Sequence, residues 1–211
     1  MLKSEIKHFI DTRIFYAFLA VFIALSAFFF FANAALTQYI FNTLPLILVF
    51  LIPILTANSL KLQSDERSSA LRVVLAKFLA VMVVYVIALA TTIAYPIIMY
   101  APFRTLFWGS LAPIYVGFLF YGAAMSAIGI LISTVAKNSA VAAMVSFGVM
   151  FILNFVDMLG LWSGNMTFAR VVNFISFSNR IFDVNLISML YFTLIATLFT
   201  LLTIHKLNRR R

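Results

Sequence analysis

The sequence predicts an all-α integral membrane protein, and three observations support this fold class. Of the 211 residues, 64% are hydrophobic and 10% are charged, which is more apolar surface than one soluble core of this size can bury. The apolar residues gather in runs of about 20, the length at which a helix crosses a bilayer. The Lys and Arg residues, 15 against 6 acidic ones, mostly flank these runs, as anionic headgroups and membrane orientation require. We therefore expect membrane lipid as a partner and no nucleic acid.

A short amphipathic helix is predicted at residues 1–13, before the first apolar run. Four apolar residues of this segment share one helical face, Leu2, Ile6, Phe9 and Ile10, a pattern typical of a helix lying in the membrane interface. A polar lead-in to the first span is the alternative. The run from Ile14 to Phe31 is longer than the apolar region of a signal peptide and follows acidic residues, so we expect a retained span.

Six apolar windows predict six transmembrane helices in a single domain, 1–211. The windows are 14–34, 40–59, 75–99, 111–134, 139–161 and 185–204. In this arrangement 12 of the 15 Lys and Arg residues fall on one side of the membrane. By the positive-inside rule, that side and both termini are cytoplasmic. Prolines inside the spans predict bends, which neighbouring helices can accommodate.

The predicted cytoplasmic loop, 60–74, combines charges of both signs. Asp65, Glu66 and Arg67 are adjacent, and acidic residues are not needed for membrane orientation. Mixed charge suits docking onto another protein, where it contributes specificity and association rate. A merely solvated loop is the alternative.

The segment 162–184 is too polar to cross the membrane, yet it has helical apolar spacing, so we expect short helices that dip into the outer leaflet. The fifth span, just before it, contains Asn154 and Asp157 on about the same face. With Arg170 and Arg180 they form a candidate translocation path or outer gate. The alternative is that Asp157 reaches the outer interface and anchors the segment that follows.

The sequence offers no recognisable catalytic or metal-binding constellation. Both histidines, His8 and His205, lie outside the predicted spans, there is no cysteine, and no phosphate-binding glycine loop is present. We therefore expect a protein that is not an enzyme, holds no metal and binds no cofactor itself. A small-residue stripe in the fourth span predicts close packing against the fifth, through Gly122, Ser126, Gly129 and Ser133.

Several stretches, in this order, resemble a known family. They are FYAFLAVFIALSAFFFF in the first span, LPLILVFLIPILT in the second, DER followed by VVLAKFLA into the third, and YVGFLFYGAAMSAIGILISTVAKNSAVAAMVSFGVMFIL across the fourth and fifth. The resemblance is to ABC-2 type transporter permeases, the membrane subunits of ABC exporters, and within them to the gliding-motility permease-like group. It is weaker from Asp157 onward.

The resemblance implies a permease subunit of an exporter in the bacterial inner membrane. A separate cytoplasmic ATPase subunit would bind ATP and Mg, and a second permease copy or homologue would complete the transporter. Residues 1–13 would be the elbow helix and 162–184 the extracellular re-entrant helices. The loop 60–74 would be the coupling element, with Asp65, Glu66, Arg67, Arg72 and Lys77 facing the ATPase.

The stretch after Arg67 is shorter than the family pattern, which indicates either a truncated coupling element or residues missing from this sequence. Two other classes of function remain open. One is an ion-coupled secondary transporter, in which Asp157 would be essential. The other is a membrane scaffold or assembly factor.

Overall fold

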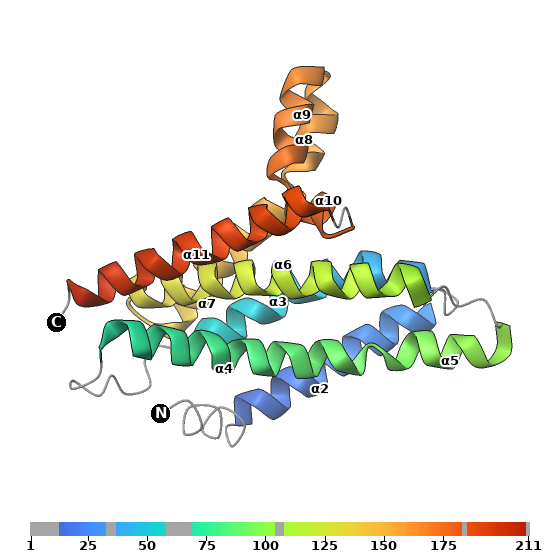
Figure 1. The fold of residues 1–211 in the computed structure, drawn as a ribbon, viewed down its shortest axis with the longest axis horizontal. Coiled ribbons are helices and arrows are strands. Elements are labelled where there is room, and N and C mark those ends of the chain that lie inside the picture. The colour runs from blue at the N-terminus through green and yellow to red at the C-terminus, as the bar shows by residue number, and fades with distance from the viewer. Residues whose placement is uncertain (1–12, 33–36, 58–68, 104–107, 183–184, 210–211) are drawn as a thin grey trace.

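The computed structural model describes residues 13–32, 37–57, 69–103, 108–182 and 185–209, and throughout these ranges every regular element is an α-helix (Figure 1). The helices are α2 (Arg13–Ala32), α3 (Thr37–Ala57), α4 (Ala70–Thr91), α5 (Ala94–Phe103), α6 (Trp108–Val135), α7 (Ser139–Phe155), α8 (Asp157–Ser163), α9 (Met166–Ile175), α10 (Phe177–Phe182) and α11 (Leu186–Asn208). The predicted all-α class is confirmed.

Four helical stretches are long and apolar enough to cross a membrane, namely Phe15–Ala32, Ala70–Ile98, Leu111–Val135 and Leu186–Asn208. They make this a multi-pass membrane protein by length and composition. Two shorter apolar helices, Phe41–Ala57 and Ser139–Phe155, occupy the predicted second and fifth spans. The count of six spans stays a prediction, and residues 1–12 of the predicted elbow helix lie outside the described ranges.

Two predicted boundaries were wrong. Helix α4 begins at Ala70, so residues 70–74 of the predicted loop are its first turn rather than loop. Helix α7 ends at Phe155, and a single residue, Val156, separates it from α8. The predicted fifth span, 139–161, is therefore two helices. Asp157 stands in the first turn of α8, where a carboxylate interacts favourably with the helix dipole and supports the new start.

The third span is nearly continuous, with a break between α4 and α5. Residues 92 and 93 form a turn, and the Thr92 hydroxyl donates to the Leu89 carbonyl at 2.7 Å. Pro96 has no N–H to donate to the carbonyl of Thr92, four residues earlier, which explains why the regular pattern is interrupted there. The break in the helix that accompanies this proline lies at residues 92 and 93, about one turn before Pro96 itself.

Helix α6 lies at the centre of the bundle and contacts α3, α4, α7, α10 and α11. Two of its glycines admit neighbouring side chains. A Cβ added at Gly122 would lie 2.2 Å from Cε1 of Tyr85 on α4, and one added at Gly129 would lie 2.2 Å from the Thr56 hydroxyl oxygen on α3. The sequence predicted close packing of this stripe against the fifth span. Helices α6 and α7 are in contact, but the atoms nearest to a Cβ at these two glycines belong to α4 and α3. Small residues allow such close approach in lipid.

The helices α8 and α9 form an antiparallel pair that projects sideways from the bundle (Figure 1). A Cβ added at Gly160 of α8 would lie 3.0 Å from Cα of Ala169 of α9, so the two helices cross closely. Gly164 closes the turn with φ of 63°, a conformation that glycine adopts without steric cost. The Asn165 side chain then accepts from the backbone N–H of Thr167 at 2.9 Å and starts α9. We call residues 157–175 the lateral hairpin.

The first prediction concerns the packing of α6. Gly122→Ala should lower the free energy of unfolding by about 1–3 kcal/mol, because the new methyl group would displace the ring of Tyr85, whose hydroxyl donates to the Phe118 carbonyl at 2.7 Å. The measurement is unfolding in mixed micelles as the denaturing detergent increases. Gly148→Ala is the matched control, since nothing lies within 4 Å of a Cβ there. Equal effects of the two substitutions would contradict the packing described.

Candidate functional site

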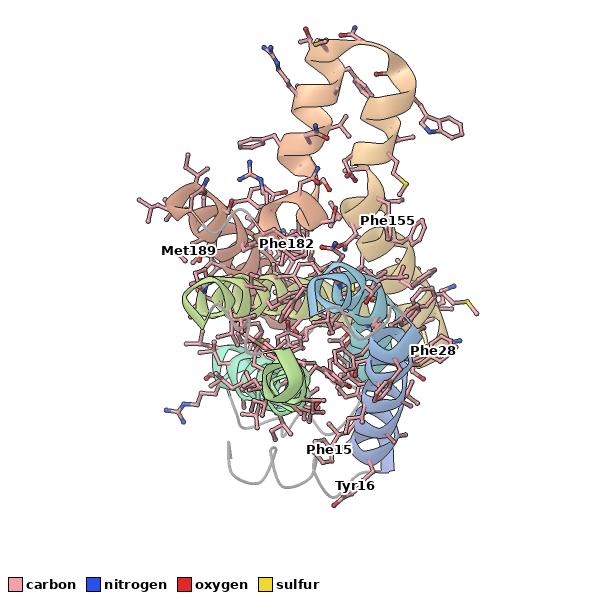
Figure 2. All side chains as sticks on the ribbon, turned by 90° about the vertical axis from the view of Figure 1, so that its right-hand side faces the viewer. Phe15, Tyr16, Phe28, Phe155, Phe182 and Met189 are labelled. Carbon is pink, nitrogen blue, oxygen red and sulfur yellow. The ribbon has the colours of Figure 1, made fainter. Side chains whose placement is uncertain are left out.

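Buried and half-buried polar side chains gather where the lateral hairpin leaves the bundle. We call this group the polar corner; it consists of Tyr121 on α6, Asn154 on α7, Asp157 on α8, Ser176 between α9 and α10, and Ser178 and Arg180 on α10. Figure 2 looks along the bundle from the right-hand side of Figure 1 and shows Phe155 and Phe182 near the base of the hairpin. Two of the members, Asn154 and Asp157, were predicted as a pair.

Asn154 is fully buried at 0% exposure and both ends of its amide are paired. The Tyr121 hydroxyl donates to its Oδ1 at 3.1 Å, and its Nδ2 donates to the Met150 carbonyl, one turn earlier, at 2.8 Å. A buried amide without these partners would be costly. The bond to Tyr121 ties α7 to the central helix one residue before α7 ends.

Ser176 connects the break between α7 and α8 to the start of α10. Its hydroxyl lies 3.2 Å from both the Asn154 carbonyl and Oδ1 of Asp157, and 3.1 Å from the hydroxyl of Ser178. A hydroxyl has one proton to donate, so the two acceptors share it. Asp157 is half-buried, and its carboxylate points into this connection rather than standing free in the outer interface.

Arg180 is 8% exposed and lies against aromatic rings. Its Nε donates to the Phe174 carbonyl at 2.6 Å, and its guanidinium carbon lies 3.9 Å from the ring centre of Phe174 and 4.5 Å from that of Tyr191. A planar cation is attracted by ring faces at such distances. The contacts of Asp157 and Arg180 within the described ranges do not pair the two, and Arg170 is exposed on α9.

A cavity of about 190 Å³ opens beside the polar corner, between α3, α7 and α10. Its lining residues are Asn42, Thr43, Pro45, Leu46, Asn154, Phe155, Ser178 and Phe182. The amide and hydroxyl groups in this set could bind a small polar group of a ligand. The sequence analysis missed Asn42, Thr43 and Ser178. The available signal was that Asn42 and Thr43 are two adjacent polar residues inside the apolar window 40–59.

The remaining predicted site residues do not form one cluster in the described structure. Leu2, Ile6, Phe9 and Ile10, and likewise Asp65, Glu66 and Arg67, lie outside the described residues. Arg72 is exposed in the first turn of α4, whereas Lys77 is 1% exposed. Because α4 begins earlier than predicted, Lys77 lies two turns inside it on the packed face, so the prediction that it faces a docking partner needs correction. Ser126 and Ser133 of the α6 stripe are buried as well.

Among the residues that the structure places, no group of three or more His, Cys, Asp or Glu side chains could hold a metal ion. No known protein-family model matches the chain, and no curated protein matches it significantly. The contacts seen in the polar corner are hydrogen bonds and cation–aromatic contacts, at a point where the direction of the chain changes.

A double-mutant cycle tests the bond between α6 and α7. Tyr121→Phe and Asn154→Leu should each lower the free energy of unfolding, with a coupling of about 0.6 kcal/mol and at most about 1.7 kcal/mol, the range for hydrogen bonds between membrane helices. Detergent-induced unfolding of the wild type, both single variants and the double variant gives the coupling. Tyr95→Phe with Asn154→Leu is the control, because the Tyr95 hydroxyl pairs with Ser26 at 2.7 Å; its coupling should be near zero. A coupling that is equal in both cycles would speak against the bond.

Arg180→Lys tests the anchor of the lateral hairpin. The ammonium group keeps the charge but loses the planar stacking on Phe174 and Tyr191. Backbone amides of α9 should then exchange hydrogen about five-fold to thirty-fold faster, as expected for a loss of about 1–2 kcal/mol. Hydrogen–deuterium exchange with mass spectrometry measures this. Arg170→Lys, an exposed position on the same hairpin, should leave exchange unchanged; an equal change in both variants would show that Arg180 does not anchor the hairpin.

Proposed function

We propose that this protein is the transmembrane permease subunit of an ABC exporter in a bacterial inner membrane. A separate cytoplasmic ATPase would supply the energy, and a second permease copy or homologue would complete the pathway. The proposal combines the resemblance of the sequence to ABC-2 permeases with the helical, multi-pass character of the chain.

The observation that carries the proposal is the interruption between α7 and α11. The resemblance implies short re-entrant helices between the fifth and sixth spans. In the structure α7 stops at Phe155, and α8, α9 and α10 follow before α11 begins at Leu186. The lateral hairpin leaves the bundle sideways (Figure 1) and exposes large apolar side chains, with Trp162 at 91% and Met166 at 79% exposure. A hairpin of this kind suits an outer-leaflet position.

The distribution of charge supports a cytoplasmic coupling end. The helix ends at one end of the bundle carry exposed basic residues, Arg72, Lys137, Lys206 and Arg209. By the positive-inside rule this end faces the cytoplasm. In the sequence, Asp65, Glu66 and Arg67 belong to the connection between α3 and α4. We propose this connection as the contact with the ATPase.

The polar corner and its cavity are then the proposed outer gate. They lie at the opposite end of α7 from Lys137. Two packing states of the helices would alternate as the ATPase opens and closes, since ATP binds its closed state more tightly and shifts the permease equilibrium with it. The chain itself would carry out no chemical step.

The experiment that tests this function is purification of the protein in mild detergent from its native operon, with mass spectrometry of the co-purifying subunits and an ATPase assay. We expect a Walker-motif subunit and vanadate-sensitive turnover. The double charge reversal Glu66→Arg with Arg67→Glu should uncouple turnover from the permease and lower it at least several-fold, because charge complementarity at a docking surface is disturbed.

Lys137→Glu is the control for the charge reversal, because Lys137 is exposed at the same end of the bundle, between α6 and α7. It should leave turnover unchanged. A protein that elutes alone and without ATPase activity would contradict the proposal. Gradient-driven transport in liposomes that Asp157→Asn abolishes would then indicate the secondary transporter, and stable partner binding without transport would indicate the scaffold.

A further inference from the structure

Arg180, at the base of the lateral hairpin, has hydrogen-bond donors that no described residue accepts from. A guanidinium group carries five N–H donors, and within the described ranges only the one on Nε is used, in the bond to the Phe174 carbonyl at 2.6 Å. The buried side-chain atoms without a hydrogen bond in this part of the chain are the hydroxyl oxygens of Ser126, Ser146 and Ser188. The terminal nitrogens of Arg180 are not among them, so they reach the surface.

The charge of Arg180 is not neutralised by a carboxylate within the described ranges. Asp157 is the only acidic residue there, and its Oδ1 accepts from the Ser176 hydroxyl at 3.2 Å. The rings of Phe174 and Tyr191 attract the cation and fix its position, but they do not cancel its charge. A guanidinium stays protonated in proteins, and a cation that is 8% exposed is costly unless an anion approaches it.

The surface on both sides of Arg180 is apolar. The two rings that it contacts belong to α9 and α11, so the guanidinium lies between these helices. About one turn before Phe174, on the same face of α9, Val171 is 53% exposed, and one turn before Tyr191 on α11 Ile187 is 61% exposed. Such positions suit the acyl chains of a lipid, and the cation between them suits its phosphate.

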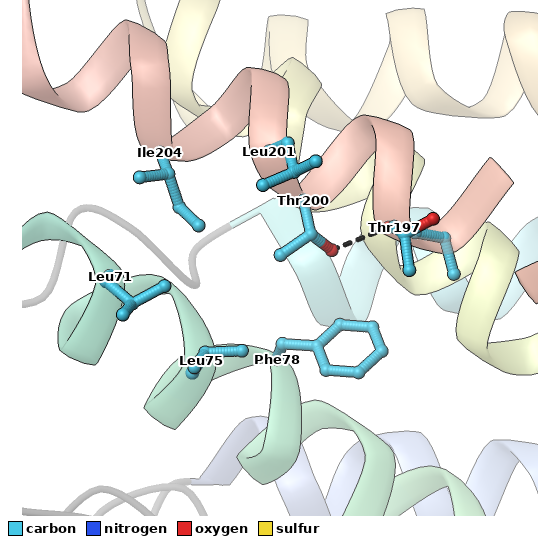
Figure 3. A pocket seen from close by; sticks show the side chains of 8 residues that line it. Leu71, Leu75, Phe78, Thr197, Thr200, Leu201 and Ile204 are labelled. Carbon is cyan, nitrogen blue, oxygen red and sulfur yellow. Dashed lines mark hydrogen bonds between the residues drawn. The ribbon is translucent and has the colours of Figure 1, made fainter. Parts of the chain in front are cut away.

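A purely apolar hollow elsewhere on the bundle provides the comparison. The α4–α11 groove has a volume of about 320 Å³, and its lining includes Leu71, Leu75 and Phe78 of α4 and Thr197 and Thr200 of α11 (Figure 3). The described lining contains no charged side chain, and the Thr200 hydroxyl already donates to the carbonyl of residue 196 at 2.7 Å. Apolar contact alone does not distinguish one lipid from another, whereas the guanidinium of Arg180 can.

We propose that Arg180 binds the phosphate group of one phospholipid, in the leaflet beside the lateral hairpin, through its two terminal nitrogens. The planar edge that these nitrogens form matches two phosphate oxygens. The acyl chains of the same lipid cover the exposed apolar side chains of α9 and α11. This inference depends on the membrane character of the chain rather than on the exporter proposal, because a chain without an ATPase partner could hold the lipid and an exporter could lack it.

Native mass spectrometry of the full chain tests the proposal. Delipidated protein in mild detergent receives equal amounts of phosphatidylglycerol and of diacylglycerol with the same acyl chains, so that only one of the two carries a phosphate. Arg180→Gln should lower the affinity of the tightest-bound phosphatidylglycerol about ten-fold or more, the factor that a hydrogen bond to a charged group supplies. Arg170→Gln, the same charge change at an exposed position of α9, and Thr200→Trp, which fills the α4–α11 groove, should leave this affinity unchanged.

A measurement on the wild type keeps the test decisive if Arg180→Gln disturbs folding. Phosphatidylglycerol, but not diacylglycerol, should slow hydrogen exchange of the α9 amides about five-fold or more; equal effects of the two lipids would overturn the proposal. Equal losses of binding in Arg180→Gln and Arg170→Gln would do the same.

Two further outcomes would identify another occupant and so overturn the assignment to a lipid. Displacement of the phosphatidylglycerol by excess inorganic phosphate would indicate a free anion, since inorganic phosphate lacks the acyl chains. Asp183 follows Arg180 by three residues in the sequence and lies outside the described ranges. Phosphatidylglycerol binding that arises only after Asp183→Asn would show that a carboxylate of the chain itself pairs with Arg180.

Discussion

The rest of the bundle depends on two positions of α6 that carry no side chain and so let neighbouring helices come close. This helix contacts α3, α4, α7, α10 and α11, and helices surrounded by lipid gain little from the hydrophobic effect when they associate. Close contact must therefore supply the association energy. Gly122 and Gly129 provide it by admitting the ring of Tyr85 and the side chain of Thr56 into the space that a Cβ would occupy. Without them α4 and α3 would stand further from the centre.

The second requirement is a stable end for α7. An abrupt helix end leaves carbonyl groups unpaired, which is costly inside a membrane protein. Here the Ser176 hydroxyl donates a hydrogen bond to the Asn154 carbonyl, and the Tyr121 hydroxyl donates one to the side chain of Asn154. Aromatic rings close the space beneath, with Phe177 and Phe192 5.2 Å apart between α10 and α11. Polar and aromatic contacts together hold the base of the lateral hairpin against the bundle.

The composition and the apolar windows were enough to predict an all-helical membrane protein, because a bilayer demands long apolar helices whatever their packing. Packing partners could not be predicted in the same way. The stripe with Gly122 and Gly129 predicts close approach, but one sequence does not say which helix approaches at each glycine. The nearest side chains there come from α4 and α3, although α7 also contacts α6. The end of α7 was missed because apolar residues resume directly after Asp157, at Met158 and Leu159, and neither proline nor glycine stands at the break itself.

In the candidate site, too, the polar residues could be predicted from the sequence but their contacts could not. Asn154 and Asp157 stood out in the sequence because polar side chains are rare in a predicted span, and both lie in the polar corner. Arg180 was predicted as part of the same path or gate, and its guanidinium lies on the rings of Phe174 and Tyr191, a contact that arises only from the fold of the segment between α9 and α11. The Nε of Arg180 donates a hydrogen bond to the Phe174 carbonyl, and the Tyr191 hydroxyl donates one to the Ile175 carbonyl. Two of the last carbonyls of α9 are thus paired by these side chains, so a gate at this corner could move only if these bonds were exchanged together.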